Sequence, residues 1–298
     1  MQKDKYPIDK ELTKLRNFNP PTSRFIIPIA SFLLKIMPKG FNKDLVDVKY
    51  YKLGMITFYV ITPKSLINKT TPCIFTIHGG GFIFRSQKSQ YYNEQEYALR
   101  CNSRVVGIDY DLSPKYAFPV ALNECYDVYN YLADNADTLK IDTNKLAVVG
   151  NSAGGLLACD LYLRLFKEPK IKPIALVLIY PVLDNLMESE SMKKYDDTPC
   201  WNSKANKKMW EYYLQGQEYI SPLKRIDEFN INNLYIELAE FDCLHDEGKL
   251  LYDLLKTKTQ NIMLNDTPNT FHGYEGNIQS TIYKQSMEKR IDFINKIL

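Results

Sequence analysis

The chain has 298 residues, of which 45% are hydrophobic and 24% are charged, and its formal net charge at pH 7 is +3. This length is enough for one large α/β domain or for two ordinary domains, each with a sizeable core. The composition is typical of a soluble globular protein, and the nearly balanced charge, without an arginine-rich segment, argues against a nucleic-acid-binding protein.

The N-terminal segment is polar and charged and shows no signal peptide, so we expect a cytoplasmic protein. An apolar stretch follows at residues 25–37 (FIIPIASFLLKIM). It contains a proline and a lysine and is far shorter than a membrane span, so we expect no stable membrane insertion. A buried amphipathic helix is the favoured interpretation, while a lid or a contact with a membrane surface remains open.

Short β-rich runs then alternate with helical patterns, which predicts a mostly parallel sheet flanked by helices. Eight runs are expected to be strands: 46–53, 55–62, 72–78, 104–110, 146–150, 174–180, 234–239 and 262–264. The first two flank Gly54 and predict an antiparallel hairpin. Helices are expected at residues 120–133, 153–166 and 278–297.

The alternation breaks between the sixth and seventh strands. Residues 186–228 are polar and aromatic, and we expect an insertion at residues 183–228 to lie over the carboxyl ends of the strands, where ligands bind in such sheets. Together with residues 1–45 it would form a helical cap over a core made of residues 46–182 and 229–298. Trp210, Tyr213 and Leu214 have helical spacing and are expected to pack inside this cap rather than contact a substrate.

The six cysteines are scattered, with neither a C-x-x-C pair nor a histidine at a metal-ligand spacing. This argues against a structural zinc site. Several of them, such as Cys73 and Cys159, lie inside apolar patterns. We therefore expect reduced, buried thiols and no metal.

Two glycine motifs predict an acyl-transfer site. Residues 150–154 (GNSAG) follow the fifth strand and have the G-x-S-x-G pattern of a nucleophile elbow, which exposes a serine hydroxyl on a sharp strand-to-helix turn. Residues 78–81 (HGGG) follow the third strand, and their backbone N–H groups can approach an oxyanion. Together they predict Ser152 as the nucleophile and an oxyanion hole formed by the N–H groups of Gly80, Gly81 and Ala153.

A serine nucleophile needs a histidine base, and the chain has only three histidines. His78 lies beside the glycine run, where its ring would brace the loop, and His245 begins a leucine-rich helix. His272 lies on the loop between the last strand and the closing helix. A base in this position follows both the nucleophile and the acid in the chain, so His272 is the expected base.

Four carboxylates near the end of the seventh strand compete for the role of the acid. Asp246 and Glu247 fall in the first turn of a helix, where the helix dipole by itself favours negative charge. Glu240 is still at the strand end. Asp242 lies in the intervening loop, from which it can reach an imidazole, and is the expected acid.

These motifs resemble those of the hormone-sensitive-lipase-like group of α/β-hydrolase esterases, which carry HGGG followed by Phe or Trp, and GDSAGG. The similarity continues through residues 109–114 (DYDLSP), 118–119, 221–223, 241–247 and 271–273, and so spans residues 46–298 in order. The resemblance implies an α/β-hydrolase fold with an N-terminal cap. It also implies hydrolysis of short- to medium-chain carboxylic esters through an acyl-enzyme, a small-molecule ester as the partner, and no cofactor.

Three positions depart from the family pattern. Asn151 stands where Asp is usual in the elbow, which removes a charge beside the nucleophile. Asp111 stands where Arg is usual, and Lys115 where Glu is common. The last two changes look like a reversed ion pair behind the oxyanion loop.

Two other functions remain open. The same residues can cleave amides, as in formamidase and peptidase relatives, because nothing in the sequence identifies the leaving group. Some members of the family are receptors that have lost the catalytic histidine, whereas Ser152, Asp242 and His272 are all present here. The sequence also leaves open the acyl-chain length and the oligomeric state, a homodimer included.

Overall fold

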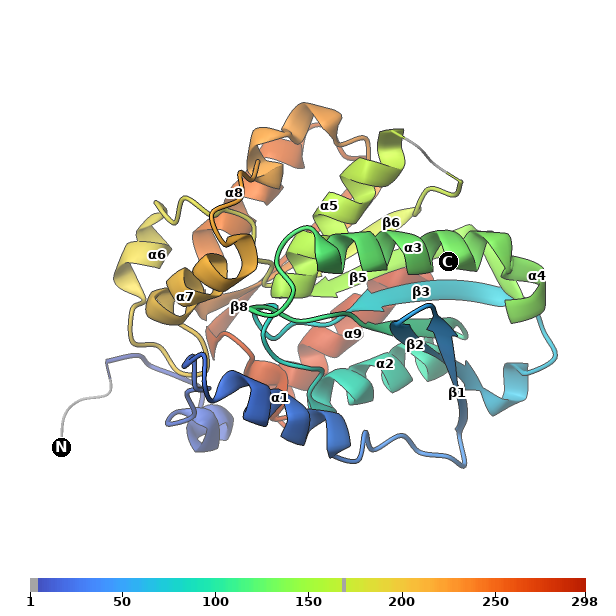
Figure 1. Ribbon diagram of the computed structural model, residues 1–298, viewed down its shortest axis with the longest axis horizontal. Helices are drawn as coiled ribbons and strands as arrows, with labels where there is room; N and C mark the ends of the chain where they lie inside the picture. The colour runs from blue at the N-terminus through green and yellow to red at the C-terminus, as the bar shows by residue number, and fades with distance from the viewer. Residues whose placement is uncertain (1–4, 168–169) are drawn as a thin grey trace.

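The computed structural model describes residues 5–167 and 170–298, in which one mixed sheet is covered by helices on both faces (Figure 1). Its strands have the spatial order β1-β2-β4-β3-β5-β6-β7-β8. They are β1 (Val46–Leu53), β2 (Ile56–Pro63), β3 (Thr71–Ile77), β4 (Arg104–Asp109), β5 (Ile141–Asn151), β6 (Ala175–Ile179), β7 (Asn233–Phe241) and β8 (Asn261–Phe271). β2 is antiparallel to both β1 and β4, and all other pairings are parallel. This is the expected α/β-hydrolase architecture.

Helices α3 and α5 pack together on one face of the sheet, and α2 and α9 on the other (Figure 1). The α-helices are α1 (Ile27–Ile36), α2 (Lys88–Arg100), α3 (Val120–Asp134), α4 (Ala136–Leu139), α5 (Ala153–Lys167), α6 (Glu190–Lys194), α7 (Ser203–Leu214), α8 (His245–Leu255) and α9 (Thr281–Asn295). Short 3₁₀ turns are η1 (Lys10–Leu15), η2 (Lys64–Leu66), η3 (Pro222–Lys224), η4 (Ile226–Glu228) and η5 (Tyr274–Gly276).

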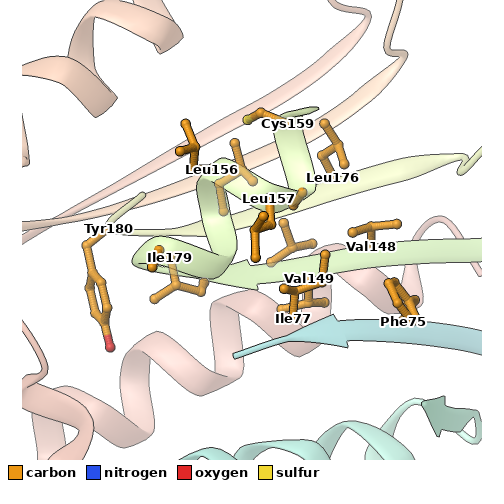
Figure 2. Packing of buried hydrophobic residues seen from close by; sticks show 14 of the residues in the cluster. Phe75, Ile77, Val148, Val149, Leu156, Leu157, Cys159, Leu176, Ile179 and Tyr180 are labelled. Atoms are coloured by element: carbon orange, nitrogen blue, oxygen red, sulfur yellow. The ribbon is translucent and has the colours of Figure 1, made fainter. Parts of the chain in front are cut away.

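The core lies between the central strands and α5. Figure 2 shows Leu156 and Leu157 of α5 packed over Val148 of β5, with Ile77 of β3 nearby. All four side chains are fully buried. Because helices cover both faces of the sheet here, the central strands are continuous apolar runs rather than alternating ones.

All eight expected strands are present, but β8 is much longer than the expected 262–264. Its sequence, NIMLNDTPNTF, is mostly polar after the first four residues. Pairing with β7 nevertheless supplies backbone partners from Asn233↔Asn261 to Ala239↔Thr267 and, after an irregularity, at Phe241↔Phe271. Since β8 is an edge strand, polar side chains such as Asp266 and Asn269 remain exposed, which hides the strand from a search for apolar runs.

Helix α2 was not expected, because polar residues interrupt the face that it buries. Its sequence, KSQYYNEQEYALR, buries Asn93 and Glu94. The Glu94 carboxylate accepts hydrogen bonds from the hydroxyls of Tyr59 (2.7 Å) and Thr76 (2.9 Å), which lie on β2 and β3. A helix held by buried polar contacts has no apolar period in its sequence.

The apolar stretch 25–37 does form a helix, α1, but the expectation that this helix is buried is wrong. Ile27 is only 2% exposed, whereas Ile29 is 61% and Phe32 is 60% exposed. The reason is that α1 packs through one narrow side, and its outer face has no neighbour within the described residues. No helix in those residues is long and apolar enough to cross a lipid bilayer.

Residues 183–228 lie beside the N-terminal segment. The backbone N–H of Cys200 donates to the carbonyl of Phe18 (2.7 Å), and the hydroxyl of Tyr212 donates to the carbonyl of Thr22 (3.1 Å). Within this insertion only the helical elements α6, α7, η3 and η4 are regular, and the described residues include no strand there.

Truncation of Leu157 tests the position of α5 on the sheet. Leu157→Ala is expected to lower the free energy of unfolding by about 2–5 kcal/mol, because it leaves a cavity in the core. Leu250→Ala in α8 is the matched control, since Leu250 is 46% exposed, and should change it by less than about 1 kcal/mol. Urea denaturation measures both, and equal losses would contradict this packing.

Candidate active site

Ser152 lies on the tight turn between β5 and α5. Its φ is 53°, a left-handed conformation that residues other than glycine rarely adopt. Its backbone N–H donates to the carbonyl of Ile179 (2.9 Å), and its carbonyl accepts from the N–H groups of Gly155 (2.8 Å) and Val182 (3.0 Å). Hydrogen bonds to the end of β6 and the segment after it therefore hold this strained residue in place.

The two outer glycines of the elbow are needed for close packing. A Cβ atom on Gly154 would collide with the carbonyl oxygen of Ile77 in β3, and one on Gly150 would collide with the carbonyl of Gly154. The turn can thus bring Ser152 against the end of β3 only when both positions lack a side chain.

Ser152, His272 and Asp242 form a hydrogen-bonded chain. Ser152 Oγ lies 2.8 Å from His272 Nε2, and His272 Nδ1 lies 2.6 Å from Asp242 Oδ2. Asp242 is fully buried, and the other two are nearly so. Donation from Nδ1–H to the carboxylate leaves Nε2 free to accept the serine proton.

Strand pairing explains how these distant residues meet. Asp242 directly follows β7 and His272 directly follows β8, and the last residues of these parallel strands, Phe241 and Phe271, are paired. Ser152 directly follows β5, which is separated from β7 by β6 in the same sheet. All three residues therefore lie at one edge of the sheet.

The other two histidines are engaged elsewhere. The ring of His78 stacks on Tyr110 at 4.2 Å between centroids, and burial lowers the pKa of His78 to about 4. His245 lies between Asp266 and Asp246, whose hydrogen bonds raise the pKa of this histidine to about 9. His78 thus braces the glycine loop, as expected, and His245 forms ion pairs on the surface.

The three carboxylates that compete with Asp242 also have other partners. Each accepts a hydrogen bond from a backbone N–H of a neighbouring segment: Glu240 from Asn269 (2.7 Å), Asp246 from Ser191 (2.7 Å) and Glu247 from Leu183 (2.8 Å). Of the four carboxylates, Asp242 is the one that contacts the imidazole of His272.

The glycine run lies beside Ser152. A Cβ atom on Gly79 would be only 3.1 Å from the Cβ of Ser152. Gly80 and Gly81 have φ values of 103° and 59°, so the backbone turns there in a way that glycine favours. Ala153 is the first residue of α5, and its N–H therefore has no acceptor within the helix. Gly80 and Gly81 line the same cavity as Ser152, and Ala153 follows Ser152 directly, so the N–H groups of these residues are the candidate oxyanion donors.

A cavity of about 380 Å³ opens over Ser152. The N-terminal segment contributes Phe18 and Met37 to its wall, and the 183–228 insertion contributes Cys200 and Trp201. The Trp201 ring covers Gly81 so closely that a Cβ there would collide with it, and its centroid is 6.3 Å from that of His272.

The sequence predicts a helical pattern at Trp201 and no role at the site, but Trp201 lies in an irregular stretch before α7. Its indole N–H donates to Asn206 Oδ1 (3.2 Å), which fixes the ring over the cavity. Trp210, the tryptophan singled out from its spacing, is instead buried in contact with the rings of Phe82 and Tyr219, as a packing role requires.

Asn151 connects the elbow to the histidine loop. Its side-chain amide donates to Glu275 Oε1 (3.0 Å), and Glu275 lies three residues after His272. The other oxygen of Glu275 accepts from Arg290 (3.1 Å). Neither Glu275 nor Arg290 was expected at the site from the sequence. The only available signal was Asn151 itself, because an amide can donate to a carboxylate whereas the usual aspartate cannot.

Arg290 also pairs with Glu237, and both side chains are fully buried. Burial alone would raise the pKa of Glu237, but Arg290 and the hydroxyls of Tyr274 and Tyr235 bring this pKa below its ordinary value. The ionised pair is therefore part of the core beneath the site.

The expected ion pair between Asp111 and Lys115 is wrong, because the cation near Asp111 is Arg85 and not Lys115. Arg85, which follows the glycine run, pairs with Asp109 at 2.6 Å and lies 4.0 Å from Asp111. The Lys115 ammonium instead lies over the ring of Tyr116 on the surface. The cation that faces Asp111 thus comes from a segment distant in sequence, which the local spacing cannot indicate.

The six thiols are free, and all but that of Cys200 belong to buried residues. Burial raises the pKa of Cys73 to about 12. Among residues 5–167 and 170–298, no group of three or more His, Cys, Asp or Glu side chains is placed to hold a metal ion.

Comparisons with known proteins agree with this fold. A family model described as alpha/beta hydrolase fold matches residues 74–276. The chain is 28% identical to an arylesterase of Saccharolobus solfataricus over 74% of each protein. It is 27% identical to an acetyl esterase of Salmonella paratyphi A, over 74% of this chain and 70% of that protein. The solved structure of a bacterial heroin esterase is similar with a TM-score of 0.86, at 27% identity and over 98% of both chains.

Replacement of Arg290 tests the buried ion pair. Arg290→Met should lower the free energy of unfolding by about 3–5 kcal/mol at pH 8, because it leaves buried carboxylates unpaired. The pKa of Glu237 then rises above its value in the unfolded chain, so the variant should lose more stability than the wild type as the pH rises from 5 to 8. Urea denaturation at both pH values measures this.

Arg100→Met is the control, since Arg100 forms partly exposed ion pairs on α2. It should change the free energy of unfolding by about 1 kcal/mol or less, with no added pH dependence. An Arg290 variant that behaves like this control would rule out a structural role for the buried pair.

Proposed function

We propose that this chain, which belongs to the hormone-sensitive-lipase-like family of α/β hydrolases, is a serine esterase that cleaves short- to medium-chain carboxylic esters. The observation that carries the proposal is the 2.8 Å contact of Ser152 Oγ with His272 Nε2, together with the 2.6 Å contact of His272 with Asp242. Similarity to an arylesterase, an acetyl esterase and a heroin esterase supports esters as the substrate class.

In the proposed acylation step, His272 Nε2 takes the proton from Ser152 while Oγ attacks the carbonyl carbon of the ester. The N–H groups of Gly80, Gly81 and Ala153 donate to the oxyanion that forms. His272 then gives the proton to the leaving oxygen. The alcohol departs, and the acyl group remains on Ser152.

Deacylation repeats these steps with water as the nucleophile. His272 takes a proton from the water that attacks the acyl carbon, and returns it to Ser152 as the carboxylic acid leaves. Asp242 has no proton to transfer. It keeps the imidazole in the tautomer that accepts at Nε2 and stabilises the imidazolium formed in each half-reaction.

The proposed enzyme has a cap over its catalytic core. Residues 1–45 and 183–228 would form the cap, and residues 46–182 and 229–298 the catalytic core. Support comes from the cavity over Ser152, which receives side chains from both cap segments. With about 380 Å³ available, this cavity suits a small ester.

Removal of the serine hydroxyl tests the proposed nucleophile. Ser152→Ala should lower kcat/KM for p-nitrophenyl acetate by about 10⁴-fold or more, because no acyl-enzyme can form. Ser103→Ala is a matched control, since Ser103 is equally buried but donates to Cys101. The control should retain both activity and labelling by a fluorophosphonate.

Full hydrolysis by the Ser152 variant would refute the proposed nucleophile. The wild type should also prefer an acetate ester to an N-formyl aryl amine. The reverse preference would identify an amide hydrolase of the same fold.

An exchange of charges tests the link between elbow and histidine loop. Asn151→Asp should lower kcat/KM by roughly 10- to 100-fold, because two carboxylates would then face each other beside the nucleophile. Adding Glu275→Gln restores an amide–carboxylate hydrogen bond in the opposite direction and should recover most of this loss. Steady-state kinetics, with melting temperatures as the folding control, measures the effect. A double variant no better than Asn151→Asp would show that this contact does not position the site.

A further inference from the structure

Helix α1 presents a continuous apolar stripe to solvent. Ile29, Phe32, Leu33 and Ile36 occupy positions i, i+3, i+4 and i+7 and are 61%, 60%, 52% and 61% exposed. Phe25, which is 86% exposed, extends this α1 stripe at its N-terminal end. Single exposed apolar side chains are common on soluble proteins, but a whole helix face of them marks an interaction surface.

The opposite side of α1 is firmly packed on the protein. Ile27 is buried against Ile83 and Phe84, with Ala30 and Leu34 packed beside them. In addition, the hydroxyl of Ser31 donates to the carbonyl of Ile83 (2.6 Å). The stripe is thus the outer face of a docked helix, which lies at the lower edge of the molecule in Figure 1.

The charged side chains of the segment that carries α1 have one sign. Residues 12–43 contain six lysine and arginine residues and no aspartate or glutamate, although the whole chain has a net charge of only +3. Arg24 and Lys35, which flank the stripe, are exposed, and neither forms an ion pair within the described residues. Lys39 lies over three tyrosine rings, among them Tyr50, and is less available.

We propose that the α1 stripe docks this protein on an anionic phospholipid surface. The helix would lie in the plane of the interface, with its apolar side chains among the acyl chains and Arg24 and Lys35 at the headgroups. A second copy of the chain is a poorer partner, since two such segments would bring like charges together. The docking does not depend on the proposed hydrolysis.

The stripe is also close to the entrance of the cavity over Ser152. Met37, the residue after α1, is 52% exposed and lines that cavity, as does Phe18. A lipid surface that covers the stripe would therefore face the cavity entrance. Apolar esters dissolved in that surface would reach Ser152 over a short path.

Vesicle co-sedimentation of the full chain tests the proposal. The wild type should bind vesicles of equimolar phosphatidylglycerol and phosphatidylcholine about tenfold or more better than vesicles of phosphatidylcholine alone. The triple variant Ile29→Ser/Phe32→Ser/Leu33→Ser should lose about tenfold or more of this binding. Arg24→Ser/Lys35→Ser should weaken binding to the anionic vesicles only.

Met55→Ser/Ile220→Ser is the matched control, because these side chains are 94% and 63% exposed but lie outside α1. It should bind like the wild type, and all variants should hydrolyse soluble p-nitrophenyl acetate equally well, which separates docking from catalysis. Equal binding by the wild type and the triple variant would overturn the proposal. So would light scattering that shows a wild-type dimer and a monomeric triple variant without vesicle binding, since the stripe would then join two copies.

Discussion

Parallel pairing of β5, β6, β7 and β8 brings the carboxyl ends of these strands to one edge of the sheet, and the candidate site is built along that edge. Ser152, Asp242 and His272 each follow the last residue of a strand directly. Each side chain is thus held by a hydrogen-bonded strand rather than by a long loop. The register of β7 and β8, which ends in the pair Phe241↔Phe271, sets the distance between the carboxylate and the imidazole.

A second constraint lies under this edge, where Arg290 holds two buried carboxylates. Glu237 belongs to β7, and Glu275 belongs to the turn after His272. Buried charges are costly unless they are paired and hydrogen-bonded, so this cluster tolerates few rearrangements. Through Asn151, the same cluster also reaches the nucleophile elbow. The packing of α9 on the sheet is thereby linked to the relative positions of serine and histidine.

The strands and the three residues that meet at this edge were predictable because their signals are local. Buried parallel strands have continuous apolar sequences, and the elbow requires glycine at positions 150 and 154. With only three histidines, the choice of His272 needed no more than strand order. Helix α2 and most of β8 were missed for the opposite reason. Polar contacts hold α2, and pairing at the edge of the sheet holds β8. Neither produces a periodic pattern of apolar residues in the sequence.

The sequence by itself therefore indicated the order of the strands along the chain, the nucleophile motif and the three residues, Ser152, His272 and Asp242, that the fold brings together. Tertiary structure alone decided which tryptophan covers the cavity, which cation faces Asp111, and that α1 turns an apolar face outward. Each of these depends on which surfaces meet in space. An apolar helix pattern shows that one face avoids water, but it does not say whether protein or another apolar phase covers that face.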